Sequence, residues 1–234
     1  MDLPTRHEQL ARIGNPCNAH VTKDRFQEWV NRKTAFVQIR QKISSRPVAI
    51  IMVGGPASGK SLAQSECVKQ LGLRATVVVD PDEVLADLFQ LDNGCYWDEN
   101  LPPDEVDVRK ATNLWLDAVV STNQSFVYDT TGRNYTFIRD VIMPKLRNYA
   151  IIFCYCESNI EVAQKRAQKR AEETGRSVDI DYLQKTYDTI PEAVEEYRAL
   201  VRSKKADALV HFKNNAECSR SNPCPIVFEK VTLN

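Results

Sequence analysis

One short stretch, residues 48–61, constrains the fold of this chain more than any other. It begins with the apolar run VAIIMV, which has the length and composition of a buried strand. The next residues, GGPASGKS, match the pattern G-x-x-x-x-G-K-[S/T] at every fixed position. A helical pattern follows and ends at Gly72, where a helix-terminating glycine is expected. The stretch therefore predicts a buried strand, a glycine-rich turn and a helix N-terminus in succession.

This arrangement predicts a site for the phosphates of a nucleoside triphosphate. Gly54 and Gly59 permit backbone angles that other residues resist, so successive N–H groups can surround a phosphate. The helix N-terminus adds unpaired donors and the positive end of its dipole. Lys60 can reach the β- and γ-phosphates, and the Ser61 hydroxyl can bind Mg²⁺. The predicted nucleotide-binding residues are Gly54, Gly55, Pro56, Ala57, Ser58, Gly59, Lys60 and Ser61, with Ser61 as the metal ligand.

The composition fits one α/β domain and argues against several other classes. The chain has 234 residues, 43% of them hydrophobic, which is enough for one domain with a full core. Basic and acidic residues both number 31, so the chain lacks a globally basic nucleic-acid surface, and a local basic groove stays open as an alternative. No apolar run reaches the length of a membrane span, and the N-terminus lacks a secretory apolar core. The odd number of cysteines, seven, favours reduced thiols and a cytoplasmic protein.

The order of the predicted elements indicates a three-layer α/β fold with a parallel central sheet. Four apolar strands are predicted at 48–53, 75–79, 125–129 and 149–155. Because they are apolar rather than alternating, and helical segments separate them, both faces of their sheet should be covered. Two further strands are predicted at 208–212 and 225–231, after helices at 179–189 and 191–203.

A further helix is predicted before this domain, from Thr22 to about Ile43, with an apolar stripe that includes Trp29. One interpretation is that the helix packs against the core from outside. The other is that it forms a surface for a protein partner. The chain is thus divided into a helical extension at 1–45 and an α/β domain at 46–234.

Carboxylates follow the second predicted strand, where parallel sheets gather their functional residues. Asp80 and Asp82 lie directly after residues 75–79. A phosphate-transferring enzyme needs a carboxylate there to orient or deprotonate the attacking hydroxyl, and we predict this catalytic role for Asp82. The same residues also suit a helix start, with Asp80 as N-cap and Pro81 in the first turn. Both interpretations can hold together.

Two later segments carry further candidate residues. Asp129 ends the third strand and Arg133 follows it, and both are predicted to bind the substrate. Asp129 could instead bind Mg²⁺ through water, or it could simply stabilise a turn together with Gly132. A basic helical stretch, residues 165–176, follows the fourth strand. Cations there could close over a γ-phosphate as charge develops on its oxygens, so Arg170 and Arg176 are predicted to be catalytic residues of a lid at about 165–180. The alternative is a solvated helix face.

The motifs GGPASGKS, VVVDPDEV, FVYDTTGR and KRAQKRAEETGR together resemble the zeta-toxin-like P-loop kinases, from about residue 46 to the C-terminus. The resemblance implies an adenylate-kinase-like sheet and ATP- and Mg²⁺-dependent phosphorylation, which founding members direct at the amino sugar of UDP-N-acetylglucosamine. It also implies the roles given above to Lys60, Ser61, Asp82, Asp129 and Arg133. The lid arginines of the family match Arg176 and, with looser spacing, Arg170 or Arg166. Residues 90–113 depart from the family's substrate pocket, so the kinase class carries over further than the acceptor.

The sequence thus predicts an ATP/Mg²⁺-dependent kinase that phosphorylates a hydroxyl of a small molecule or sugar nucleotide, with UDP-N-acetylglucosamine as first candidate. One alternative is a polynucleotide 5′-hydroxyl kinase, which uses the same parts. Another is a nucleotide-dependent binding or switch protein without an acceptor. The predicted partners are ATP and the acceptor, with a protein partner at the N-terminal helix, nucleic acid only as substrate, and no membrane.

Overall fold

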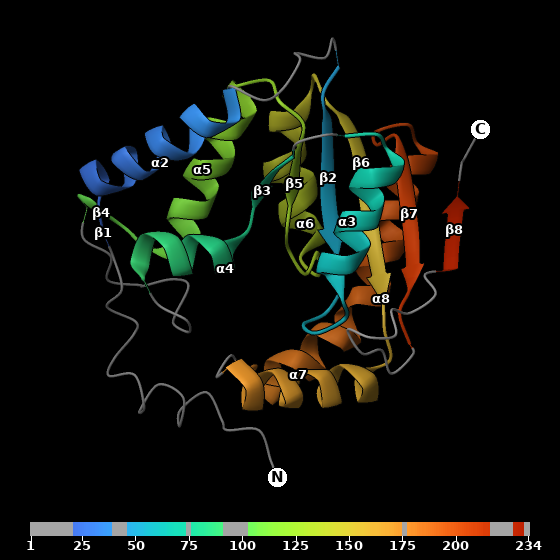
Figure 1. Ribbon diagram of the computed structural model, residues 1–234. Coiled ribbons are helices and arrows are strands. Elements are labelled where there is room, and N and C mark those ends of the chain that lie inside the picture. Colours follow the sequence, from blue (N-terminus) through green and yellow to red (C-terminus); the bar gives the residue numbers. More distant parts are fainter. Residues whose placement is uncertain are drawn as a thin grey trace.

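The computed structural model describes residues 21–38, 46–73, 76–90, 103–174, 177–215 and 227–231. Within them a six-stranded sheet has the order β3-β5-β2-β6-β7-β8 (Figure 1). Its strands are Val48–Val53 (β2), Val77–Val79 (β3), Phe126–Tyr128 (β5), Ala150–Glu157 (β6), Ala208–Lys213 (β7) and Val227–Val231 (β8). The helices are Lys23–Gln38 (α2), Lys60–Gln70 (α3), Pro81–Val84 (α4), Val108–Ser121 (α5), Tyr135–Phe137 (α6), Ile160–Thr174 (α7) and Ile180–Arg202 (α8). A π-helical turn, Leu85–Phe89, continues α4, and irregular turns at Ile138–Ile142 and Met143–Leu146 continue α6.

The pairing of the strands confirms the predicted parallel sheet. β2 lies between β5 and β6 and is parallel to both. β3 joins the outer side of β5, and β7 joins the outer side of β6, again in parallel. β8 is antiparallel to β7 and ends the sheet on that side. The carboxyl ends of β2, β3 and β5 therefore meet at one edge, which is where a parallel sheet places its site.

Successive residues of β2 point into two cores on opposite faces of the sheet. Ala49, Ile51 and Val53 belong to the larger core, whereas Ile50 and Met52 belong to the smaller one. Helices α5 and α8 contribute to the larger core, and α3 covers the smaller one. A strand buried on both faces needs apolar residues at every position, which is why its sequence is continuous rather than alternating. The three-layer architecture is confirmed.

Helix α2 packs against α5 at one side of the molecule (Figure 1). Trp29 of α2 meets Trp115 of α5 edge to face, with 5.3 Å between ring centroids. Just before these helices, β1 (Val21–Thr22) pairs with β4 (Glu105–Val106). The described part of the apolar stripe is therefore covered by the chain itself. A partner surface on this helix, and the division at residue 45, stay predictions.

One helix differs from the sequence expectation. The segments predicted as separate helices at 179–189 and 191–203 form the single helix α8, which runs through Pro191. Proline costs a backbone hydrogen bond inside a helix. Buried residues on both sides of it, such as Ile190 and Val194, join the larger core and compensate for that loss. The part of the predicted N-terminal helix after Gln38 lies outside the described residues, as do the predicted strand residues 75, 225 and 226.

Candidate functional site

The glycine-rich turn lies at the carboxyl end of β2 and leads into α3 (Figure 1). The Gly54 N–H donates to the Thr131 carbonyl at 3.0 Å, and the Ser58 N–H donates to the Gly55 carbonyl at 3.2 Å. Gly59 is the N-cap of α3, in the left-handed region at φ 95°, and no side chain of the described residues caps this N-terminus. A helix that starts in this way presents its positive end to an anion.

The side chains of the loop also fit an anionic ligand. Lys60 folds back over the loop, where its ammonium donates to the carbonyls of Gly54 at 3.2 Å and Gly55 at 3.3 Å. Ser58 is fully buried, and its hydroxyl has no hydrogen-bond partner among the described residues. A buried hydroxyl without a partner is costly unless a ligand or water satisfies it. Ser61, in the first turn of α3, is exposed at the same end.

Arg166 of α7 and Asn214, just past β7, hold the loop through the carbonyl of Ser58. The Asn214 amide donates to this carbonyl at 2.8 Å, and Arg166 Nη1 donates to it at 3.3 Å. Arg166 Nη2 also donates to the Asn214 side-chain oxygen at 3.0 Å. The sequence pattern marks Arg166 only as an alternative match to a lid arginine and gives no sign of this network. Ser58 and Asn214 are 156 residues apart, and no local pattern links them.

Carboxylates follow two neighbouring strands at this edge of the sheet, and one of them, Asp129, interacts electrostatically with Lys60. Asp80 and Asp82 follow β3, and Asp129 follows β5. The Asp129 N–H donates to the carbonyl of Val79, at the end of β3, at 2.9 Å. The Asp80 carboxylate accepts the Asp82 N–H at 2.8 Å and caps α4. The helix-start interpretation is therefore confirmed, and the same cap fixes the backbone that carries Asp82.

Burial and mutual repulsion raise the pKa of two of these carboxyl groups. Burial, together with the charges of Asp129 and Asp82, raises the pKa of Asp80 to about 7. Burial also raises the pKa of Asp129, and Asp82 adds to this effect while Lys60 opposes it. Near neutral pH, the cluster therefore holds a proton part of the time. Perturbed carboxyl groups of this kind are typical of sites that handle protons.

Asp80→Asn is expected to stabilise the protein at alkaline pH. Because the folded-state pKa of Asp80, about 7, exceeds its ordinary 3.8, stability is lost as the pH rises between these two values. Asparagine cannot ionise, yet it is an equally good N-cap. Thermal melts should show the variant melting several degrees above the wild type at pH 8 and at the same temperature at pH 4. Asp80→Ala, which loses the cap, is the control and should melt below Asp80→Asn at both pH values. A wild type that melts above Asp80→Asn at pH 8 would contradict the assignment.

The remaining predicted site residues are three arginines, and the structure describes two of them. Arg133 lies on the loop after β5, with its guanidinium 4.9 Å from the ring centroid of Tyr182 on α8. Arg170 lies one turn beyond Arg166 on α7 and is half-buried. Arg176 lies outside the described residues. The structure thus places Asp129 within electrostatic reach of both Lys60 and Asp82, and it places Arg133 beside α8.

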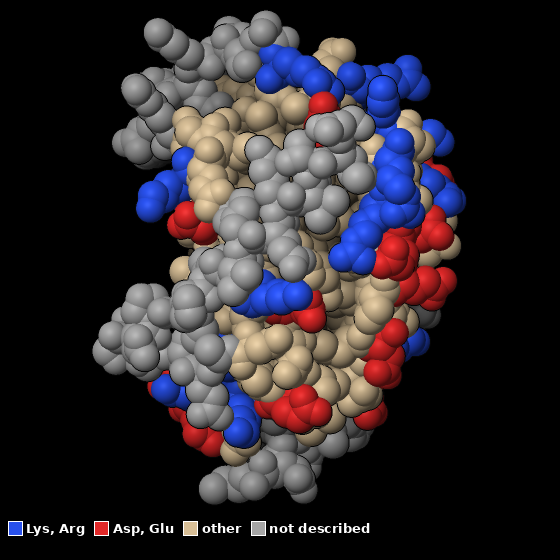
Figure 2. All heavy atoms as spheres, turned by 90° about the vertical axis from the view of Figure 1, so that its right-hand side faces the viewer, with Lys and Arg blue, Asp and Glu red and all other residues tan. Residues whose placement is uncertain are grey.

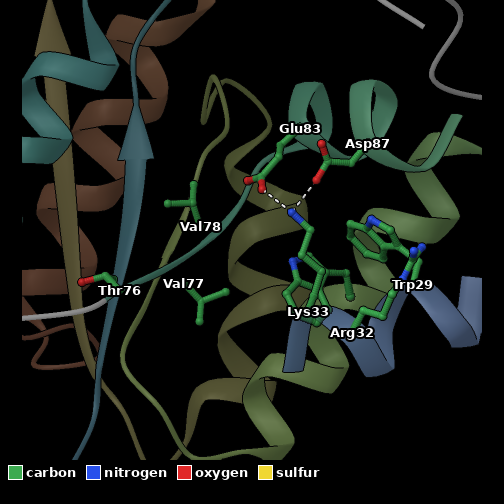
Figure 3. Close-up of a pocket in the computed structure, with 9 residues that line it drawn as sticks. Trp29, Arg32, Lys33, Thr76, Val77, Val78, Glu83 and Asp87 are labelled. Carbon is green, nitrogen blue, oxygen red and sulfur yellow. Dashed lines mark hydrogen bonds and ion pairs between the residues drawn. The ribbon is translucent and has the colours of Figure 1, made fainter. Parts of the chain in front are cut away.

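A separate pocket of about 640 Å³ opens between α2, β3, α4 and α5 (Figure 3). In it, the Lys33 ammonium lies between Glu83, at 2.6 Å, and Asp87, and 5.5 Å from the Trp29 ring centroid. Its lining includes neither residues of the glycine-rich loop nor any of the predicted site residues. The pocket and the site adjoin along β3 and α4, because Val77 and Val78 line the pocket and Asp82 precedes Glu83 on α4.

The sheet order, the glycine-rich loop and the facing carboxylates define the class of protein as a P-loop phosphotransferase. The family model described as zeta toxin matches residues 33–219. Because the match covers most of the chain, the chain belongs to the zeta toxin family, and it is a nucleotide-dependent kinase. No curated protein matches the sequence. Within the described residues, no helix is long and apolar enough to span a membrane.

Solved structures share the fold at low sequence identity. A chain from the PezAT chromosomal toxin–antitoxin system of Streptococcus pneumoniae is 16% identical, with a TM-score of 0.55 over 83% of this chain and 78% of that one. A chain of the AvrRxo1-ORF1:AvrRxo1-ORF2 structure with sulphate ions is 13% identical, with a TM-score of 0.63 over 99% of this chain and 76% of that one. The AvrRxo1-ORF1:-ORF2 structure with ATP is 11% identical, with a TM-score of 0.60 over the same shares, 99% and 76%. At these identities the likeness establishes the fold alone.

Proposed function

We propose that the chain transfers the γ-phosphate of ATP, with Mg²⁺, to a hydroxyl of a small-molecule or sugar-nucleotide acceptor. The observation that carries the proposal is the position of Asp129, whose carboxyl group interacts electrostatically with both Lys60 of the glycine-rich loop and Asp82 after the neighbouring strand. The similar AvrRxo1-ORF1:-ORF2 structure contains ATP, which supports ATP as the donor. Membership of the zeta toxin family makes UDP-N-acetylglucosamine the first candidate acceptor.

On the donor side, residues 54–61 bind the triphosphate. Lys60 would bind the β- and γ-phosphates in place of its two carbonyl partners, and the Ser61 hydroxyl would hold Mg²⁺. The bound ion supplies charge neutralisation on the phosphate oxygens. Within the described residues, no group of three or more His, Cys, Asp or Glu side chains could hold a metal ion. That fits Mg²⁺, which usually keeps waters and phosphates as most of its ligands.

On the acceptor side, Asp82 orients the attacking hydroxyl and accepts its proton as the new O–P bond forms and the bond to ADP breaks. Asp129 holds the acceptor through a hydroxyl, and Arg133 binds an acceptor phosphate. Arg170 and Arg176 are proposed to stabilise charge on the transferring phosphoryl group from the lid. Arg166, which already contacts the loop, is placed to contribute to the same end.

The proposal is tested by transfer from γ-³²P-ATP and Mg²⁺ to a panel of UDP-N-acetylglucosamine, nucleosides, and 5′-hydroxyl DNA and RNA oligonucleotides. Lys60→Ala serves as the blank, because it removes the phosphate-binding ammonium and should abolish transfer. Lys60-dependent label on the sugar nucleotide is the expected result. Label only on oligonucleotide ends would move the chain to the polynucleotide kinases. Release of inorganic phosphate alone, with no labelled acceptor, would favour a nucleotide-dependent binding or switch protein.

The charge distribution does not favour the polynucleotide alternative. The net charge is zero. Figure 2 shows that basic and acidic side chains of the described residues both occur on the same face of the molecule. Strong binding to nucleic acid needs a basic surface that follows the phosphate backbone. We therefore retain the small-molecule or sugar-nucleotide acceptor as the conclusion.

A further inference from the structure

Tyr187 of helix α8 contacts the phosphate-binding loop. Its hydroxyl donates to the Pro56 carbonyl at 3.2 Å and lies 3.5 Å from the Ser158 hydroxyl. Its ring lies against the backbone of Gly55: a Cβ added at Gly55 would stand 2.2 Å from the ring. One tyrosine therefore contacts two consecutive residues of the loop, from a position 131 residues further along the chain.

The ring of Tyr187 explains why a glycine occupies position 55. The motif G-x-x-x-x-G-K-[S/T] leaves this position open. Gly55 does not have the positive φ that would require glycine, unlike Gly54 and Gly59. An alanine at position 55 would cause no strain in the backbone, but its Cβ would collide with the ring of Tyr187. The pairing of Gly55 with Tyr187 is thus a matter of packing rather than of backbone conformation.

The helix that carries Tyr187 is itself firmly placed. Neighbouring residues Thr186 and Ile190 are buried. Ten residues beyond Tyr187, the buried hydroxyl of Tyr197 donates to the Gly132 carbonyl at 2.6 Å. The Tyr197 ring also stacks on Phe153 of β6, with 4.3 Å between centroids. Tyr187 therefore projects to the loop from an element anchored in the larger core.

We propose that Tyr187 is a positioning residue of the nucleotide site, which holds Gly55 and Pro56 in place before the triphosphate binds. Glycine-rich segments lose much conformational entropy when they become ordered. A contact that orders the loop in the free protein lowers the entropy lost on binding and so raises affinity. The inference rests on the proposed function for the identity of the ligand. Tyr187 acts through the loop and touches no reacting atom.

The test compares Tyr187→Phe with Tyr149→Phe. Tyr149 is a matched control, because its hydroxyl also donates to a backbone carbonyl at 3.2 Å, that of Val120, at the end of α5. Calorimetric titration with the non-hydrolysable ATP analogue AMP-PNP and Mg²⁺ gives the dissociation constant. Tyr187→Phe should weaken binding about three- to tenfold, the usual effect of one lost hydrogen bond. Tyr149→Phe should lower the melting temperature and leave the dissociation constant unchanged. Equal dissociation constants for Tyr187→Phe and wild type would overturn the inference.

A double-mutant cycle tests the packing of the ring on Gly55. Gly55→Ala in the wild-type background should weaken AMP-PNP binding at least thirtyfold, roughly the loss expected when a binding loop is displaced by half an ångström or more. In a Tyr187→Ala background, the same substitution should cost less than about threefold, because the obstructing ring is gone. Equal costs in the two backgrounds would show that the residues act independently and would refute the inference.

Failure of this inference can be told from failure of the proposed function. Affinity for AMP-PNP is measured without any acceptor. Weaker binding by Tyr187→Phe would support the inference even if no acceptor in the panel were labelled. Labelled acceptor together with unchanged affinity in the Tyr187 variants would overturn the inference and leave the kinase assignment intact.

Discussion

Asp82→Asn is expected to lower the rate of phosphoryl transfer by about 10²- to 10⁴-fold, the range of general-base contributions. Asparagine has the same shape as aspartate but cannot accept the hydroxyl proton. The Asp82 N–H still bonds to Asp80, so the start of α4 is preserved. Affinity for nucleotide should change by less than about threefold, because the γ-phosphate is bound mainly by the loop and Lys60. Steady-state kinetics and calorimetric titration measure the two quantities.

The control for this variant is Glu83→Gln, a substitution of the same kind at the next residue. The Glu83 carboxylate contacts Lys33 in the pocket between α2 and α4, and Asp87 retains its own contact with Lys33 when Glu83 is neutral. Its transfer rate should stay near that of the wild type. If Asp82→Asn instead lost nucleotide affinity in proportion to rate, Asp82 would be a nucleotide-binding residue and the catalytic assignment would be wrong.

Gly59→Ala is expected to weaken nucleotide binding by about 10²-fold or more. The left-handed backbone at φ 95° disfavours any side chain, and a Cβ here would stand 2.0 Å from the Asn214 amide nitrogen. Asn214 would have to leave the Ser58 carbonyl, and the loop would shift with it. A shift of about 1 Å at a binding site is enough for a loss of this size. Titration with AMP-PNP and Mg²⁺ measures the effect.

Gly72→Ala separates backbone strain from collision. Gly72 also has positive φ, at 66°, but a Cβ there would meet no described atom within 4 Å. This variant should lose about 1 kcal/mol of stability through strain alone and keep its affinity for nucleotide. Equal affinities in Gly59→Ala and Gly72→Ala would show that the contact with Asn214 does not shape the loop.

Several predictions that the structure confirms depend only on neighbouring residues. The run VAIIMV is buried as β2, and Gly72 ends α3 with positive φ as expected. Asp80 caps α4 with Pro81 in its first turn, as the sequence DPDE predicts. Side-chain caps and apolar runs act over a few residues, so their signals are readable in sequence. The error at Pro191 has the opposite origin, because packing of α8 against the larger core outweighs a local helix-breaking signal.

The sequence by itself determined the class of this protein. A strand, a glycine-rich loop and a helix within one short stretch define a phosphate site through local backbone geometry, and the acidic residues after the next strands indicate transfer. How the loop, the acidic residues and the later segments of the chain come together depends on the tertiary structure. Placing β5 between β3 and β2 brings Asp129 beside Asp80, where burial and then the charge of Asp129 raise the pKa of Asp80 to about 7. The fold also brings Asn214, after β7, and Tyr187, on α8, to the loop from late in the chain. Burial, Coulombic repulsion and packing depend on distances in space, and no local sequence pattern encodes those distances.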